Sequence, residues 1–142
     1  MHITREPISM DAFLKEKPAA SCGASVYFIG TVRNHQDGKS VKNLYYECYE
    51  SMADKQITAV VDYVKRAYGA DRIRVLHRVG WLEVGDVAVM IEANSVHRQE
   101  AFAACRAVIE EIKKKVPIWK KEIDEDGTSE WVFCPHVAEV IP

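Results

Sequence analysis

Residues 95–122 read SVHRQEAFAACRAVIEEIKKKVPIWKKE, and the chain is organised around this stretch. Its apolar residues recur at three- and four-residue spacing, which is the period of one buried face of an α-helix. Ser95 is the predicted N-cap ahead of the run, and Pro117 is predicted to stop the helix. The apolar positions are Ala101, Phe102, Cys105, Val108, Ile109, Ile112 and Val116.

Basic residues gather at both ends of this predicted helix. His97 and Arg98 fall in or just before the first turn, where free backbone N–H groups and the helix dipole favour an anion. At the other end, a rotation of about 100° per residue places Lys113 and Lys115 on opposite borders of the apolar stripe and Lys114 on the polar face. A lysine at such a border is expected to be partly desolvated, which lowers its pKa. The helical period does not separate Lys113 from Lys115.

A structural interpretation of the same residues is also available. Lysines near a helix C-terminus are favourable for the dipole alone, and most such runs are solvated. A His-Arg pair at a helix start more often forms a polar turn than a catalytic pair. On the pattern alone, a solvated structural role for these residues is therefore more common than a functional basic site.

Length and composition favour one globular domain over residues 1–142. Of the 142 residues, 48% are hydrophobic and 28% are charged, which is ordinary for a chain with a buried core. The net charge of −2 argues against a general nucleic-acid binder. No apolar run reaches membrane-spanning length, and the N-terminus is too polar for a secretory signal. The chain is therefore expected to act in the cytoplasm, without nucleic acid or membrane as a partner.

The four cysteines, Cys22, Cys48, Cys105 and Cys134, lack the close spacings of zinc sites and redox pairs. Free thiols in a reducing compartment are the expectation. No pair of histidines has the helical spacing of a zinc hydrolase, and no glycine-rich segment matches a nucleotide-binding motif. We therefore expect neither a metal nor a cofactor, and a metal-dependent hydrolase is disfavoured.

The remaining periodicities predict an α+β fold, because strands and helices do not alternate as in a doubly wound sheet. The strands over 23–32 and 41–50 are expected to pair across the loop between them, and the segment 80–85 reads as a turn region. Gly30, inside the first strand, suggests close approach of another backbone or of a ligand. The predicted elements are strands at 23–32, 41–50, 71–79 and 86–93, helices at 10–15, 52–68 and the stretch above, and a hairpin formed by 118–123 and 129–133.

His77 and Arg78 lie near a predicted strand end, just before a glycine turn. A histidine in such a position more often makes structural hydrogen bonds than it performs catalysis. We therefore favour a structural or surface role for this pair.

Several segments, taken in order, resemble the large, catalytic subunit of molybdopterin synthase. Each is modest alone, but together they are specific, and they cover about residues 22–133. The segments are GASVYFIGTVRN (23–34), LYYECY (44–49) followed by Met52-Ala53, HRVGWLEVGD (77–86), SVHR (95–98) with Ala101-Phe102, PIWKKE (117–122), Asp126-Gly127 and Trp131-Val132.

The resemblance implies an α/β-hammerhead-like fold with mixed and antiparallel sheets, two main amphipathic helices and a C-terminal hairpin. It implies a sulfurtransferase that converts cyclic pyranopterin monophosphate into molybdopterin by installing a dithiolene. The sulfur would arrive as the C-terminal thiocarboxylate of a small ubiquitin-like subunit. Two large subunits would form a central homodimer within a heterotetramer.

Matched position by position, the resemblance also implies roles for individual residues. Lys113 and Lys120 would be the catalytic lysines, which separates Lys113 from Lys115 where the helical period could not. His97 would be an acid or base, and Phe28 would form a pocket wall, with plain strand core as its alternative. The implied substrate-binding residues are Arg33, His97, Arg98, Lys113, Lys120 and Phe28.

A non-catalytic module with the same basic cleft, holding an anionic partner tail, is the competing hypothesis. Such a module would need cations but no acid or base. The joint presence of His97, Lys113 and Lys120 favours the enzyme.

Overall fold

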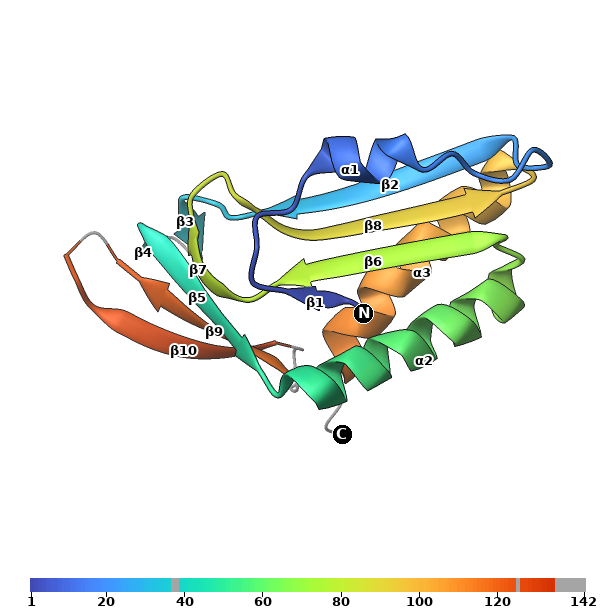
Figure 1. Cartoon of the computed structure of the whole chain (residues 1–142). Helices are drawn as coiled ribbons and strands as arrows, with labels where there is room; N and C mark the ends of the chain where they lie inside the picture. The colour runs from blue at the N-terminus through green and yellow to red at the C-terminus, as the bar shows by residue number, and fades with distance from the viewer. Residues whose placement is uncertain (37–38, 125, 135–142) are drawn as a thin grey trace.

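A four-stranded sheet with the order β1-β6-β8-β2 lies at the centre of the computed structural model, which describes residues 1–36, 39–124 and 126–134. The β1–β6 pair is parallel, and the other two pairs are antiparallel. Figure 1 shows a short helix on one face of this sheet and two long helices on the other. The strands are β1 (Ile3–Thr4), β2 (Ala24–Thr31), β6 (Arg72–Arg78) and β8 (Val87–Ser95).

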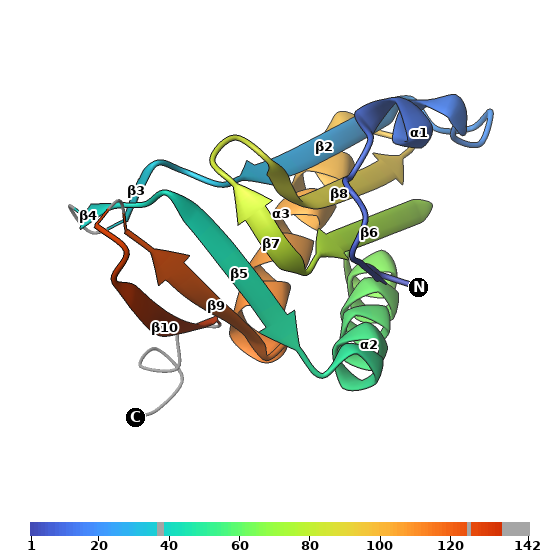
Figure 2. The same cartoon turned by 60° about the vertical axis from the view of Figure 1, so that its left-hand side comes forward.

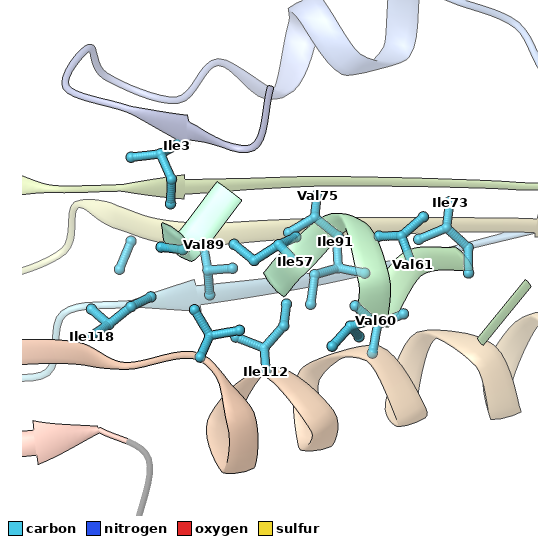
Figure 3. Packing of buried hydrophobic residues seen from close by; sticks show 14 of the residues in the cluster. Ile3, Ile57, Val60, Val61, Ile73, Val75, Val89, Ile91, Ile112 and Ile118 are labelled. Carbon is cyan, nitrogen blue, oxygen red and sulfur yellow. The ribbon is translucent and has the colours of Figure 1, made fainter. Parts of the chain in front are cut away.

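The helices are α1 (Met10–Lys15), α2 (Glu50–Tyr68) and α3 (Arg98–Lys115). The two long helices bury their apolar stripes against the sheet, as the 3.6-residue period requires. The core between these layers is seen from close by in Figure 3. It contains Ile57, Val60 and Val61 from α2, Ile112 from α3, and Ile73, Val75, Val89 and Ile91 from the sheet.

A second four-stranded sheet, with the order β10-β9-β5-β7, stands beside the first (Figure 2). All its pairs are antiparallel. A small hairpin, β3 (His35–Gln36) with β4 (Lys39–Ser40), lies between β2 and β5 in the chain. The strands of the second sheet are β5 (Asn43–Cys48), β7 (Gly80–Glu83), β9 (Ile118–Ile123) and β10 (Ser129–Cys134).

The α+β class and most predicted elements are confirmed, including the helices and the terminal hairpin. The predicted pairing of the first two long strands is wrong: β2 pairs with β8, whereas β5 pairs with β7 and β9. The reason lies in burial. β8 is buried along nearly its whole length and needs a neighbour on each side, whereas β5 alternates between buried and less buried residues. The short β3–β4 hairpin therefore leads from one sheet to the other.

Two local predictions are also corrected. The segment 80–85 contains strand β7, whose Leu82 is 1% exposed while Trp81 faces out at 57%. The sequence indicated a turn here because glycines stand at both ends of the segment. Gly80 and Gly85 do adopt positive φ, but the segment that they bound contains this four-residue strand. Ser95 is not the N-cap of α3: it ends β8, and its hydroxyl donates to the Gly69 carbonyl at 2.8 Å. His97 takes the N-cap position, without a side-chain cap bond.

Gly69 directly follows the predicted helix over 52–68 and ends α2 in the left-handed conformation, with φ 71°. A Cβ there would meet only Glu100 Cγ at 4.0 Å, so a substitution carries a backbone cost rather than a clash. Gly69→Ala is expected to lower the free energy of unfolding by about 1 kcal/mol, the cost of left-handed backbone for a residue with a Cβ. Urea denaturation measures this. Gly69→Asn is the matched control, because asparagine tolerates this conformation better and should lose less; equal losses would contradict the explanation.

Candidate active site

A pocket of about 290 Å³ lies where the central sheet, the second sheet and the last turn of α3 meet. On the central sheet its wall is a cross-strand row: Gly30 of β2 faces Val89 of β8, which faces His77 of β6. A Cβ at Gly30 would lie 2.8 Å from Val89 Cγ1. Gly30 therefore allows the close approach of a neighbouring side chain, that of Val89, rather than of another backbone.

The opposite wall is the inner face of the second sheet. Successive side chains of a strand point to opposite faces, so Lys120 and Glu122 of β9 share one face. Tyr46 of β5 lies directly across from Lys120, and Leu44 lies across from Glu122. All four residues line the pocket, which places one carboxylate beside its cations.

The structure distinguishes Lys113 from Lys115, both in the last turn of α3, by their burial and contacts. Lys113 is half-buried and lines the pocket. The side chain of Lys115 is 62% exposed, and its Nζ lies 2.8 Å from a carboxylate oxygen of Glu111. This hydrogen bond and the charge of Glu111 raise the pKa of Lys115. Of these two lysines, therefore, only Lys113 combines partial burial with access to the pocket.

Two further predicted site residues reach the same pocket from the β2 side. Arg33 lies two residues after the end of β2 and is exposed. Phe28 of β2 lines the pocket and is 38% exposed. Four parts of the chain thus contribute predicted site residues to one pocket: α3 (Lys113), β9 (Lys120), β2 (Phe28) and the segment after β2 (Arg33).

His97 and Arg98 do not line this pocket. They are exposed at the first residues of α3, whereas Lys113 lies in its last turn. Sixteen residues at a rise of 1.5 Å separate His97 from Lys113 by roughly 24 Å along the helix. Within one copy of the chain, these two groups cannot contact the same small ligand.

His77 is 2% exposed and belongs to the pocket wall, although the sequence favoured a structural or surface role. Its Nδ1 lies 2.9 Å from the carbonyl oxygen of Arg78. Its ring meets the ring of Tyr46 edge to face, with centroids 5.3 Å apart. Burial, together with the charge of Lys113, lowers the pKa of His77 to about 4. The imidazole is therefore neutral at ordinary pH.

Sequence reasoning gave no role to His77 or Glu122 in the pocket. The alternation 118, 120, 122 along β9 was a signal for Glu122, since it puts this residue on the face of Lys120. The row Ile73, Val75 and His77 was a corresponding signal on β6. Neither signal says that the two faces meet.

Among the described side chains, no three His, Cys, Asp or Glu residues gather as a metal site would require. The described cysteines Cys22, Cys48 and Cys105 are free. Burial raises the pKa of Cys105 to about 11, so this residue is a thiol rather than a reactive thiolate. No helix in the described part of the chain is both long and apolar enough to cross a bilayer.

The fold and the pocket define a class of protein: an α+β chain with a small cationic pocket suited to an anionic group. Comparison with known proteins narrows this class. The family model for the MoaE protein matches residues 3–115. The molybdopterin synthase catalytic subunit of Thermoplasma volcanium is 40% identical over 131 residues, 92% of this chain and 96% of that protein.

Solved structures agree with this result. The crystal structure of molybdopterin synthase from Staphylococcus aureus has a TM-score of 0.85 and 38% identity, covering 92% of this chain and 95% of that one. A complex of subunits 1 and 2 of molybdopterin-converting factor from Helicobacter pylori shares the fold, with a TM-score of 0.74 at 20% identity, over 95% and 90% of the two chains. The chain belongs to the MoaE family of molybdopterin synthase catalytic subunits, enzymes of molybdenum cofactor biosynthesis.

Proposed function

We propose that this chain, as a single catalytic domain over residues 1–142, transfers sulfur from the C-terminal thiocarboxylate of a small ubiquitin-like subunit to cyclic pyranopterin monophosphate. The product is the dithiolene of molybdopterin. The observation that carries the proposal is the convergence of Lys113, Lys120 and Arg33 on one pocket in a chain of this family. In each transfer the acyl–sulfur bond breaks as the sulfur bonds to a substrate carbon, and water converts the carrier's acyl group into a carboxylate. A carbon–oxygen bond of the substrate breaks at that carbon, and the oxygen leaves with a proton. Two such transfers, each from its own thiocarboxylate, install the two sulfurs of the dithiolene.

The pocket lysines suit an anionic sulfur donor. A thiocarboxylate entering a partly dry pocket loses hydration, and a fixed cation offsets that loss. Lys113 is half-buried and Lys120 approaches from the facing sheet, so a tail between them meets cations on two sides. We assign them as the catalytic lysines, which neutralise the tail and handle protons as the acyl–sulfur bond breaks.

Arg33 and Phe28 are assigned to the substrate. A guanidinium binds a phosphate through two parallel N–H bonds, and Arg33 stands exposed at the pocket rim. Phe28 offers an apolar surface against which a flat ring system can pack.

His97 and Arg98 enter this proposal through a second copy of the chain. In a symmetric homodimer the same patch of each copy faces the other, so the start of one α3 can approach the pocket of its partner. This arrangement reconciles an acid–base role for His97, and anion binding by Arg98, with the length of the helix. The assembly would be a homodimer with one small subunit on each large subunit. The Helicobacter pylori complex of subunits 1 and 2 is consistent with such a partner.

A cytoplasmic location accompanies the proposal, since free cysteine side chains fit a reducing compartment. Neither nucleic acid nor membrane is required by the proposed chemistry.

The alternative is a module that binds the anionic tail without turning over. A single-turnover assay separates the two functions. The purified protein is mixed with a thiocarboxylated ubiquitin-like subunit and cyclic pyranopterin monophosphate, and the dithiolene is detected as its oxidised fluorescent derivative. Product formation is expected. Tight binding of the subunit without product would replace the enzyme by the binding module.

A further inference from the structure

One polar side chain interrupts an otherwise apolar row on the helix-facing side of β6. Ile73 and Val75 pack into the core there, and His77 occupies the next position of the row with 2% exposure. An aliphatic residue would fill a purely structural position without the cost of burying imidazole nitrogens. His77 lies at the end of the row that opens on the pocket.

The hydrogen bond of His77 decides which ring nitrogen carries the proton. The Arg78 carbonyl oxygen only accepts, so Nδ1, 2.9 Å away, is the donor. In the neutral ring, Nε2 is then an acceptor on the far side of the imidazole. The edge-to-face contact with Tyr46 holds the ring plane. The fold thus presents one neutral acceptor of defined orientation at the pocket wall.

The charged and titratable groups around His77 are mostly cations. Among these groups, Lys113 has the largest effect on the pKa of His77. Its positive charge acts together with burial and lowers that pKa to about 4. Because His77 stays neutral, it does not repel these cations at ordinary pH. The other groups that line the pocket are Lys120 and Glu122 of β9, Tyr46 of β5, Arg33 after β2, and His35 of β3.

We propose that His77 is a positioning residue for Lys113: its Nε2 accepts a hydrogen bond from the Lys113 ammonium when the pocket is occupied, and so aims the remaining Nζ–H bonds at the bound anion. No proton moves in this step. The inference rests on the proposed function for the identity of that anion, the thiocarboxylate tail. It gives the lysine a fixed direction, which a flexible four-carbon side chain lacks by itself.

Two substitutions of His77 distinguish a role in positioning Lys113 from a purely structural role. In His77→Asn, the amide nitrogen stands near Nδ1 and can keep the bond to the Arg78 carbonyl, but nothing replaces Nε2. In His77→Gln, the amide reaches the Nε2 position and offers an oxygen acceptor. Single-turnover sulfur transfer is expected to fall about tenfold in His77→Asn, since a hydrogen bond to a charged group is lost. His77→Gln should recover most of the rate, with both variants melting as folded proteins.

The pH profile and a double-mutant cycle make the test specific. An acceptor bond favours the charged amine, so its loss in His77→Asn should move the alkaline limb of activity to lower pH. In a Lys113→Ala background, the effect of His77→Asn should vanish. A His77→Asn variant with the parental rate and pH profile, or with an undiminished effect in the Lys113→Ala background, would overturn the proposal.

A readout without turnover keeps this inference distinct from the proposed function. The protein is labelled with ¹³C at lysine Cε, which leaves the Nζ–H bonds intact, and the Lys113 signal is assigned by its absence in Lys113→Ala. Its pKa, measured by NMR titration with the thiocarboxylated subunit bound, should be lower in His77→Asn than in the parent. Absence of dithiolene in the parent would reject the sulfur transfer only, whereas an unchanged Lys113 pKa would reject the positioning role.

Discussion

Replacing Lys113 by alanine is expected to slow dithiolene formation at least about a hundredfold, the usual effect of removing one preorganised charged or hydrogen-bonding group from an active site. Lys113 is half-buried in the pocket wall, so water does not readily replace its charge. Its neighbour Ile112 anchors the same turn in the core and is left in place. Single-turnover rates with saturating thiocarboxylated subunit measure the effect, and Lys120→Ala should fall in the same range.

Lys115→Ala is the matched control for Lys113. It removes the same side chain two residues further on, where the side chain is 62% exposed and forms an ion pair with Glu111. The rate should stay close to that of the parent, because the exposed charge is screened by solvent. Thermal melts of both variants should resemble the parent, because neither lysine belongs to the apolar core. The opposite pattern, with Lys115→Ala inactive and Lys113→Ala active, would remove Lys113 from the site.

Local pattern predicted the elements because each element depends on nearby residues. The repeat of Ala101, Cys105, Val108 and Ile112 predicted α3, and all four are buried. The helix predicted over 52–68 likewise ends where expected, because Gly69 follows it with a positive φ that glycine adopts readily. Such signals act within a few residues, so tertiary context seldom overrides them.

Pairing between distant strands was beyond the same reasoning. β2 and β5 are neighbours in sequence, but β2 joins β8, more than fifty residues away. The choice depends on which strand must be covered on both edges, a property of the assembled sheet. Ser95 shows the same limit: its hydroxyl serves the end of α2 instead of the start of α3.

For the candidate site, too, some features could be predicted from the sequence and others could not. The separation of His97 from Lys113 follows from helix rise alone and was implicit in the sequence. The resemblance selected Lys113 over Lys115 where helical period could not, and burial agrees with that selection. The position of His77 in the pocket could not be predicted from the sequence, because the pocket forms only where the central sheet and the second sheet meet.

Removal of Glu92 should have the largest effect on stability. Glu92 is completely buried in the middle of β8, on the face of the central sheet opposite the long helices. Its carboxylate accepts hydrogen bonds from Arg74, Tyr27 and Asn94. Arg74 in turn lies over the ring of Phe13, 4.6 Å from its centroid, so the pair links α1 to the sheet.

Glu92→Ala is expected to lower the free energy of unfolding by about 3–5 kcal/mol, because Arg74 and Tyr27 lose their buried acceptor. Among the described residues, Arg74 then keeps only the exposed carboxylate of Glu16 as counter-charge. Urea denaturation at pH 7 measures this loss. Glu110→Ala is the matched control: Glu110 also pairs with an arginine, Arg106, but the two side chains are 51% and 80% exposed. Solvent screens that pair, so its loss should change stability little. Equal losses in the two variants would show that the Glu92 network contributes no more than a surface pair.

Acid should reduce the difference between the parent and Glu92→Ala. Burial alone would raise the pKa of Glu92, but the hydrogen bonds from Arg74, Tyr27 and Asn94 outweigh it and hold the pKa below its ordinary value of 4.5. The unfolded chain therefore binds this proton at higher pH than the folded chain does. The stabilisation is complete above the unfolded pKa and is lost as the pH falls through the folded one. The gap between the unfolding free energies of the two proteins should narrow as the pH falls from about 7 to about 3; a constant gap would mean that Glu92 stabilises through packing and not through its charge.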